Sequence, residues 1–507
     1  MRVSPVLFSL LIGSVSAEEY LIRFKSPNGF QFFMESAKDH TKTFKEFFHN
    51  KISRTFSFGS FRGITVDISQ DVVEKIRNNP LVAELVPNIQ FKAFDDVSDL
   101  PELELHYSGD NRSDESGDDD GYNPYKVKVQ DEAPRHLARL SRRASLPYEF
   151  DDEHKYEESF NYYYYKWHKG RSVNAYIIDT GIYKDHEDFC GRAVFGQDFT
   201  GEGPGDGNGH GTHVAGIVGS RTFGVAKKVN LVEVKALNNR GQGNLTTVIS
   251  AVEFAVNHCR SSGKKGCVAN LSLGAIRNSV INQAIKAAYE AGLIVVVAAG
   301  NSNINSCWNS PASAPEAITV GAFDDRTDTI AKFSNWGPCV DIFASGVKVK
   351  SLSAFPPHKP IMFSGTSMAS PSVTGFVAIL LDKGVEPEKV KDKIVELSTP
   401  DILQKRTLFF KPGTPNRIIF NGVEKDDDEY DDAIYPIVDI ETLVQELQNY
   451  QPPPSLEFNK DGKFDIINFK DDVPLPIGTI DLTKRKILSP AVNKKLIFNS
   501  LKKGKLI

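Results

Sequence analysis

Two histidines stand three positions apart in the stretch NGHGTHVAG, and their imidazoles could serve either a metal ion or a proton transfer. His210 and His213 would share one face of a helix, because positions i and i+3 lie on the same side. A zinc site needs further histidine, cysteine or acidic ligands at a suitable spacing, as in HExxH. Gly211 and Thr212 stand between the histidines, without a glutamate. The metal interpretation is therefore weak, and the alternative is one imidazole that acts as a base.

Three more polar residues follow apolar runs or precede an apolar helix. Asp179 ends the run VNAYIID, Asn301 follows VVVAAG, and Ser367 lies in FSGTSMASP, before the largely apolar SVTGFVAILL. A serine is a weak nucleophile until an imidazole takes its proton and a carboxylate orients that imidazole. A side-chain amide and the free N–H groups of a helix N-terminus can stabilise an oxyanion. Each residue alone is more often a helix cap or turn residue, but the four together predict acyl transfer by a serine.

The elements that must position these residues lie between about residues 128 and 422. Near-continuous apolar runs alternate there with segments of helical spacing, such as TTVISAVEFAVNHC. This alternation predicts an α/β fold in which helices flank a parallel sheet. Ligands and catalytic groups gather at the carboxyl ends of the strands in such sheets. The expected strands are VNAYIID, NLVEVKA, VANLSL, LIVVVAA, AITVGA and VDIFA.

Four other segments complete the chain. Residues 1–17 combine one arginine, a short apolar run and small residues, which is the pattern of a secretory signal peptide. Residues 18–94 alternate strand-like and amphipathic helical stretches and predict a small α+β domain. Residues 95–127 form an acidic linker that contains serine and glycine. Residues 423–507 lack the pattern of a packed core and are interpreted as a C-terminal extension that is processed or disordered.

Composition and short motifs restrict the partners and the compartment. The 507 residues carry a formal net charge of −5, which gives no reason to expect a nucleic-acid partner. No later segment is long and apolar enough for a membrane anchor. The five cysteines would meet an oxidising compartment, and their odd number leaves one outside the intramolecular pairs. Sequons make Asn111 and Asn244 candidate glycosylation sites.

The motifs IIDTG, GHGTHVAG, AAGNSN and GTSMASP, in this order, strongly resemble the subtilisin-like serine proteases over roughly residues 128–385. Connecting stretches such as GRAVFGQDF and SPASAPEAITVGA are similar to the proteinase K and cerevisin branch found in fungi. Subtilisin itself is the standard example of the order Asp, His, Ser and of an asparagine oxyanion donor. The resemblance implies a monomeric serine endopeptidase that acts on proteins or peptides and requires no cofactor. The implied catalytic residues are Asp179, His210 and Ser367, with Asn301 as oxyanion donor and His213 as a packing residue.

The resemblance also implies how peptides are held and how activity is controlled. Residues 18–94 are similar to the family's propeptide, which inhibits its own catalytic domain with its C-terminal end in the cleft. A zymogen of this kind would reach the vacuole, the exterior, or a cell or spore wall. Asn270 would belong to the cleft floor, so its sequon is discounted. The implied substrate-binding residues are Ser272, Leu273 and Gly274, as an edge strand, and Ala298, Ala299 and Gly300, as walls of the pocket for the residue before the scissile bond.

A disulfide and a calcium site are implied in the same way. Some relatives bridge cysteines equivalent to Cys307 and Cys339, and closing a loop of about 30 residues contributes roughly 3–4 kcal/mol. The other three cysteines receive no assigned pairing. Calcium is common in the family. The residues aligned with one of its calcium sites are Pro315, Ala317 and Asp341.

Departures from the family pattern motivate a second interpretation. Relatives usually continue Ser-Leu-Gly with more glycines, where this chain has Ala275 and Ile276. Ser372 stands in PSVTG, where relatives have Pro-His-Val-Ala-Gly. The alternative to an active enzyme is therefore a protease-like structural protein of a cell or spore wall with little turnover. A zinc hydrolase is a third interpretation, and the intact Asp-His-Ser set favours the serine protease over both.

Overall fold

The computed structural model describes residues 18–36, 51–94, 126–149 and 160–423, with two short pairs at 480–481 and 486–487. The expected signal peptide, nearly all of the acidic linker, Asn111 and almost the whole C-terminal extension lie outside the described residues and stay predictions. In the extension, β23 (Ile480–Asp481) and β24 (Lys486–Ile487) pair antiparallel. They belong to a second unit, whereas nearly all the other described residues form one compact unit.

A ten-stranded sheet runs through the larger unit in the order β21-β22-β18-β16-β14-β12-β8-β10-β9, with β17 beside β16. Every neighbouring pair from β9 to β22 is parallel. The six strands expected from the sequence form its centre, so the predicted α/β fold with a parallel sheet is confirmed. The strands are β8 (Val173–Asp179), β9 (Ala193–Asp198), β10 (Asn230–Lys235), β12 (Gly266–Leu271), β14 (Ile294–Ala298), β16 (Ile318–Asp324), β17 (Thr329–Ile330), β18 (Ile342–Ser345), β21 (Thr399–Pro400) and β22 (Arg417–Ile418).

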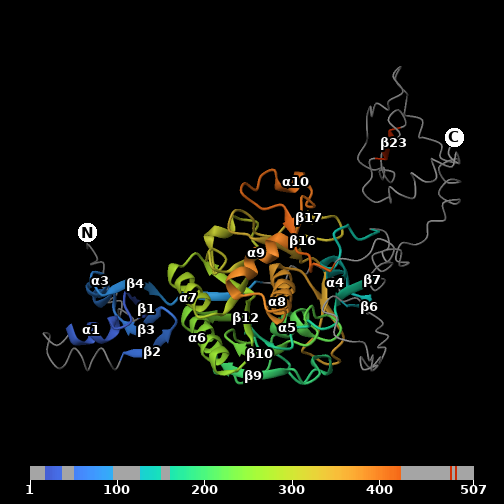
Figure 1. The fold of residues 1–507 in the computed structure, drawn as a ribbon. Helices are drawn as coiled ribbons and strands as arrows, with labels where there is room; N and C mark the ends of the chain where they lie inside the picture. Colours follow the sequence, from blue (N-terminus) through green and yellow to red (C-terminus); the bar gives the residue numbers. More distant parts are fainter. Residues whose placement is uncertain are drawn as a thin grey trace, which may run out of the picture. The chain divides into compact units, whose positions relative to one another are not determined.

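Helices cover both faces of this sheet (Figure 1). On β8, Ala175 and Ile177 pack in one core with α5 and α8, whereas Tyr176 and Ile178 pack in another with α6 and α7. The two cores lie on opposite faces, because successive side chains of a strand point in opposite directions. The helices are α5 (His210–Gly219), α6 (Leu245–Ser261), α7 (Ser279–Glu290), α8 (Thr366–Asp382) and α9 (Pro387–Leu397).

The N-terminal residues form the small α+β domain that the sequence predicts. Its antiparallel sheet has the order β2-β3-β1-β4. Apolar residues of this sheet and of two helices form a third hydrophobic core. The elements are β1 (Glu18–Phe24), α1 (Gly29–Ser36), β2 (Ile52–Phe58), β3 (Phe61–Ile68), α3 (Gln70–Arg77) and β4 (Val82–Pro87).

Short elements complete the larger unit. A second four-stranded sheet has the order β11-β5-β13-β15, and β6 pairs with β7. β6 begins one residue before the predicted start of the catalytic domain at residue 128. These elements are β5 (Gln90–Ala93), β6 (Val127–Ala133), α4 (Arg135–Leu140), β7 (Phe160–Tyr165), η2 (Glu187–Phe189), β11 (Gln242–Asn244), β13 (Leu273–Ile276), η3 (Ser306–Trp308), β15 (Asn309–Ser310), β19 (Val349–Ser351), β20 (Ile361–Phe363) and α10 (Lys405–Leu408).

Two disulfides join cysteines of the described residues. Cys307 pairs with Cys339, which is the pair implied by the resemblance. Cys259 pairs with Cys267 and links the end of α6 to β12. This second pairing was left open by the sequence, and Cys190 is the remaining free, exposed thiol.

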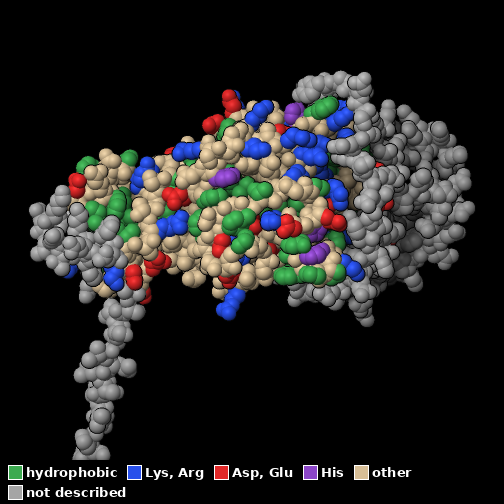
Figure 2. Space-filling model, turned by 90° about the horizontal axis from the view of Figure 1, so that it is seen from below, with side chains coloured by type: hydrophobic (Ala, Val, Ile, Leu, Met, Phe, Trp, Pro, Cys, Tyr) green, Lys and Arg blue, Asp and Glu red, His purple; other side chains and the backbone are tan. Residues whose placement is uncertain are grey.

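The surface carries a mixture of side-chain types. Acidic, basic and apolar groups are intermingled on the face of the described residues seen in Figure 2. The exposed large apolar residues include Phe409 and Phe410, directly after α10, and Ile276 in β13. None of the helices in the described part of the chain is long and apolar enough to cross a membrane.

Candidate active site

A carboxylate and an imidazole meet at the carboxyl end of β8. Asp179 ends this strand and is fully buried, and His210 opens α5. His210 Nδ1 lies 2.7 Å from Asp179 Oδ1, and Thr180 N donates to the same oxygen at 2.8 Å. A carboxylate only accepts, so it holds the imidazole proton on Nδ1 and leaves Nε2 as the basic nitrogen. An added Cβ on Gly211 would come within 2.2 Å of the Gly181 carbonyl oxygen, so glycine permits this close approach of α5 to β8.

The serine expected to be the nucleophile lies at the end of the neighbouring strand. Ser367 is the second residue of α8 and is fully buried. Its hydroxyl donates to Ser272 O at 3.3 Å, directly beyond β12. Because β12 pairs with β8 and α5 shares a core with α8, the hydroxyl lies at the same edge of the sheet as the Asp179–His210 pair. The tertiary structure thus gathers three residues that are far apart in the sequence.

The expected oxyanion donor packs on the first turn of α8. Asn301 follows β14, and its Oδ1 accepts hydrogen bonds from Thr366 N at 2.9 Å and Thr366 Oγ1 at 2.8 Å. An added Cβ on Gly365 would lie 3.0 Å from Asn301 Nδ2, so the amide nitrogen faces the backbone two residues before Ser367. The two bonds to the oxygen orient the NH₂ group as a donor at the helix N-terminus. Backbone N–H groups without helical partners also lie there.

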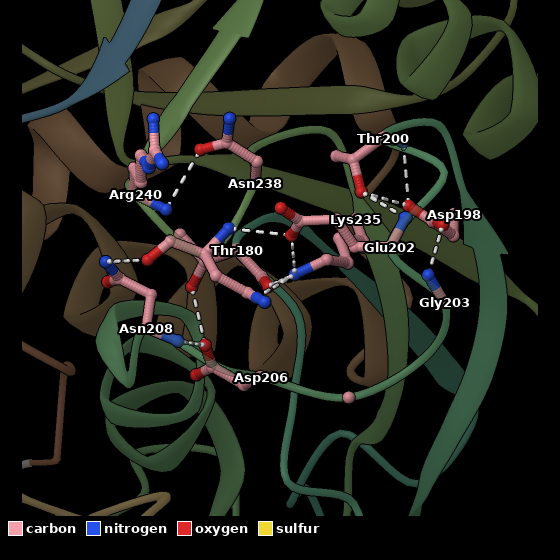
Figure 3. Close-up of polar contacts among 12 residues, drawn as sticks. Thr180, Asp198, Thr200, Glu202, Gly203, Asp206, Asn208, Lys235, Asn238 and Arg240 are labelled. Atoms are coloured by element: carbon pink, nitrogen blue, oxygen red, sulfur yellow. Dashed lines mark hydrogen bonds and ion pairs between the residues drawn. The ribbon is translucent and has the colours of Figure 1, made fainter.

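Asp206 holds the loop that carries the imidazole, although it lies outside the four sequence motifs. Its carboxylate accepts hydrogen bonds from Thr180 Oγ1 at 2.9 Å, Gly209 N at 2.8 Å and Thr212 N at 2.8 Å. Figure 3 shows the bond between Thr180 and Asp206. Asp206 therefore ties the residue after Asp179 to the start of α5. Asp206 lies four residues before α5, whose N-cap position is held by Gly209, so an ordinary capping signal in the sequence does not identify it.

Lys235 is a second supporting residue that was missed. It ends β10, is almost fully buried, and donates from Nζ to Thr180 O at 2.5 Å and to Asn239 Oδ1 at 2.9 Å (Figure 3). Glu202 Oε2 lies 3.6 Å from the same amine. A buried lysine is stable only with such partners. The available signal was a lysine at the end of a strand in which apolar residues alternate with Glu233.

His213 has partners other than those of His210. Its Nε2 lies 3.1 Å from each of the carbonyl oxygens of Val349 and Ile361, and its ring stacks on Phe363 with centroids 4.5 Å apart. Burial lowers the pKa of His213 to about 3, so this imidazole stays neutral. His213 thus packs in the core while His210 engages the carboxylate. Within the described residues, no group of three or more His, Cys, Asp or Glu side chains could hold a metal ion.

The edge strand expected to bind substrate is already paired with another segment of the chain. β5 lies between β11 and β13 in an antiparallel arrangement with both. Leu273 of β13 is opposite Ala93, and Gly274 is opposite Lys92. β-strand addition of this kind is a common way to bind an extended peptide. The end of the N-terminal domain therefore occupies the position where a substrate strand is expected.

Phe94 lies next to the serine expected to be the nucleophile. Its N–H donates to Ser272 O at 3.4 Å, the same carbonyl oxygen that accepts the Ser367 hydroxyl. An added Cβ on Gly274 would lie 2.4 Å from Cζ of Phe94, so the ring uses space that only a glycine leaves.

The three residues expected to wall the specificity pocket lie directly before Asn301. Ala298 and Ala299 are fully buried, and Asn335 Nδ2 donates to Ala299 O at 2.8 Å. Gly300 has a φ of +106°, and an added Cβ there would lie 2.4 Å from Asn335 Nδ2. A side chain at position 300 would therefore be strained and would clash. The structure places the three residues at the carboxyl end of β14, and their role as pocket walls stays a prediction.

The remaining predicted site residues have other partners. Asn244 is the N-cap of α6, where its side chain accepts from Thr247 N at 2.9 Å, and its glycosylation stays a prediction. The backbone oxygens of Pro315 and Ala317 and the carboxylate of Asp341 all contact Lys391 Nζ. The resemblance aligns these three residues with one of the family's calcium sites. A lysine amine in their midst does not fit a bound cation.

Comparisons with known proteins show the family of this chain. The model of the subtilase family, Peptidase_S8, matches residues 170–417. Subtilase-type proteinase RRT12 of Saccharomyces cerevisiae is 48% identical over 96% of this chain and 99% of that protein, and cerevisin of the same yeast is 36% identical over 72% and 54%. A crystal structure of a cold adapted subtilisin-like serine proteinase matches with a TM-score of 0.50 at 35% identity, over 58% of this chain and 100% of that one. The chain therefore belongs to the subtilase family of subtilisin-like serine peptidases.

Proposed function

We propose that the protein is a serine endopeptidase made as an inactive precursor, in which Asp179, His210 and Ser367 hydrolyse peptide bonds. The observation that carries this proposal is the buried pair of Asp179 and His210, at 2.7 Å, beside a serine at a helix N-terminus. The protein would enter the secretory pathway through its predicted signal peptide, and its two disulfides are consistent with an oxidising compartment. Its destination would be the vacuole, the exterior, or a cell or spore wall.

The proposed reaction begins when the Ser367 hydroxyl turns from Ser272 O toward His210. Nε2 of His210 takes the proton while Oγ attacks the substrate carbonyl, and Asp179 stabilises the imidazolium that forms. The Ser367 N–H and the Asn301 amide donate to the tetrahedral oxyanion. His210 then gives its proton to the leaving amine. In the second half of the reaction, His210 takes a proton from water, whose oxygen attacks the acyl carbonyl. His210 then returns this proton to Ser367 Oγ as the ester bond breaks and the acid is released.

The precursor would be inhibited because its own chain fills the cleft. Phe91 of β5 is fully buried and packs in the core that contains α6 and α7. Phe94 would be the residue before the scissile bond, because its N–H donates to Ser272 O, the carbonyl oxygen that also accepts the Ser367 hydroxyl. The bond cut during maturation would therefore be the one between Phe94 and Asp95. Substrates would share this pattern, with large apolar residues at the positions of Phe91 and Phe94.

The N-terminal domain is held on the catalytic domain by helices α6 and α7. Ser57 N donates to Glu253 Oε1 at 2.7 Å, and Ser60 Oγ donates to Glu290 Oε2 at 2.5 Å. An added Cβ on Gly59 would lie 2.3 Å from the carbonyl oxygen of Ala287 in α7, so the turn packs directly on this helix. Such contacts support a template and inhibitor role, because parallel sheets form slowly from non-local contacts.

Another protease could remove the N-terminal region at the dibasic pair of Arg142 and Arg143. Arg142 is buried, and Arg143 Nη1 donates to Ser398 O at 3.2 Å. The preceding helix α4 carries the fully buried Arg139. A protease needs an exposed, extended segment, so these contacts favour processing upstream of β6.

Released fragments test the position of the scissile bond. We expect the small fragment produced by self-processing to end at Phe94, as measured by its intact mass at the earliest detectable time. Phe94→Asp should slow processing by at least about tenfold, because a carboxylate would replace a ring in the pocket. Lys92→Asp introduces the same group two residues earlier at an exposed position and should process normally. A fragment that ends elsewhere, with Phe94→Asp processed at the normal rate, would refute this assignment.

The alternative of a wall protein with little turnover is not favoured. Ala275 lies in β13 opposite Ser310, and Ser372 is buried within α8, so both departures leave the elements of the site formed. Labelling with a fluorophosphonate decides between the two functions, because only an activated serine reacts. Stoichiometric labelling of Ser367 in the processed protein, together with hydrolysis of peptides, is the expected result. A processed protein that neither reacts nor cleaves peptides would be the structural one.

A further inference from the structure

The amine of Lys391 lies among three oxygens that belong to two different loops. Its Nζ donates to Pro315 O at 3.1 Å and to Ala317 O at 2.8 Å, and it lies 2.9 Å from Asp341 Oδ1. An ammonium group has three N–H donors and no acceptor. Each donor therefore has one acceptor, and the amine is fully satisfied by this cluster.

An oxygen cluster of this composition also suits a small hard cation. Calcium takes carboxylate and backbone carbonyl oxygens, with six to eight ligands at about 2.3–2.6 Å. The second carboxylate oxygen of Asp341 is already engaged, since it accepts from Thr319 N at 2.8 Å. Burial raises the pKa of Asp341 and the charge of Lys391 opposes this rise, so a positive charge at this place favours the ionised carboxylate.

The cluster lies at the opposite edge of the sheet from the catalytic residues. Pro315 and Ala317 precede β16 and Asp341 precedes β18, so the oxygens gather at the amino ends of these strands. Lys391 comes from α9, whose Val390 and Ile394 are buried in the core shared with α8. The amine therefore fastens α9 to the loops at the base of the sheet. We expect its loss to affect stability and not the chemical step.

We propose that the Lys391 ammonium group takes the place of a calcium ion at this cluster. The thermal stability of the domain then does not depend on calcium binding at this position. The covalent attachment of the ammonium group to α9 keeps the charge in place at any calcium concentration. The proposal is independent of the protease activity, because its test uses a protein without the nucleophile.

Thermal unfolding of the full chain in a Ser367→Ala background, which prevents autolysis, tests this proposal. Lys391→Met keeps the aliphatic stem and removes the amine. We expect it to lower the apparent Tm by about 3–8 °C in excess chelator, and we expect calcium chloride to restore part of this loss. Lys389→Met is the matched control, since Lys389 lies on the same helix with a 73% exposed side chain and pairs with Glu386. It should leave the Tm unchanged.

The background protein, which keeps Lys391, should gain no Tm from calcium binding at this cluster. Its Tm in calcium minus its Tm in chelator should therefore be the same with and without Asp341→Asn. The proposal is wrong if calcium stabilises the background protein and Asp341→Asn abolishes that gain, because the ion would then bind here despite the amine. It is also wrong if Lys391→Met keeps its Tm, or if calcium restores none of the loss. A calcium ion bound elsewhere would shift all variants alike. In the active protein, Lys391→Met should keep kcat/KM at low temperature and shorten the half-life of activity on heating.

Discussion

Ser367→Ala is expected to fold, to lack protease activity and to keep residues 18–94 covalently attached. The nucleophile is the only hydroxyl proposed to attack the bond after Phe94, so a chain without it cannot process itself. Turnover should fall by about 10⁶-fold, the size measured for the triad serine of subtilisin, a member of the same family. The fold should survive, because alanine removes only a hydroxyl that donates one hydrogen bond of 3.3 Å.

Expression in a host without related proteases, followed by measurement of the intact mass, checks this prediction. Ser372→Ala is a suitable control, since Ser372 lies buried on the same helix and its Oγ has no hydrogen-bond partner among the described residues. That control should mature to the wild-type size. If Ser367→Ala also matures to that size in such a host, the removal of the N-terminal domain is not autocatalytic.

Asp179→Asn is expected to reduce kcat/KM by about 10⁴-fold, a size known from triad aspartates in serine proteases including subtilisin. Asp179 Oδ1 accepts from both His210 Nδ1 and Thr180 N. An asparagine oxygen can keep both bonds, so the imidazole stays oriented. The negative charge is lost, however, and the imidazolium formed during attack loses its stabilisation in a buried site. The new NH₂ group would replace Oδ2, which has no hydrogen-bond partner among the described residues, and would itself be buried.

A carboxylate at the end of β9, two strands away from β8 in the sheet, provides the comparison. Asp198 ends β9 and accepts from Thr200 N at 2.7 Å and Gly203 N at 2.8 Å, without a role in the proposed reaction. Asp198→Asn should therefore retain activity within a fewfold of the wild type. Steady-state kinetics on a peptide substrate would measure both variants after an added protease has removed the N-terminal domain at a site introduced into the acidic linker. An activity of Asp179→Asn within tenfold of the wild type would contradict the role of its charge.

Much of the fold could be predicted from the sequence because its central strands are buried on both faces. The run VNAYIID coincides with β8, and all seven of its residues are buried. A near-continuous apolar run of this length is typical of a strand that is buried on both faces of a parallel sheet. The residues proposed to be catalytic were also named from the sequence, because Asp179, His210 and Ser367 each stand in a long motif with few alternatives.

Residues with ordinary sequence surroundings were not found in this way. Asp206 and Lys235 act through hydrogen bonds to loops that are distant in sequence, and neither belongs to a motif used for the assignment. Cys259 and Cys267 are eight residues apart, but the sequence alone leaves Cys190 as an equally suitable partner for either. The pairing is decided by the contact between the end of α6 and the start of β12. Local patterns carry no information about which of several compatible partners becomes a neighbour.

The sequence by itself therefore determined the class of the fold, the residue types of the four motifs and the α+β character of the N-terminal region, since these follow from local periodicity and from residue types. Only the tertiary structure decided that β5 lies between β11 and β13, that Phe94 and Ser367 both donate to Ser272 O, and that Lys391 meets three oxygens of distant loops. Each of these results depends on a pairing between segments that are far apart in the chain. Such pairings are selected by the packing of the whole domain, because each segment could satisfy its hydrogen bonds in several ways.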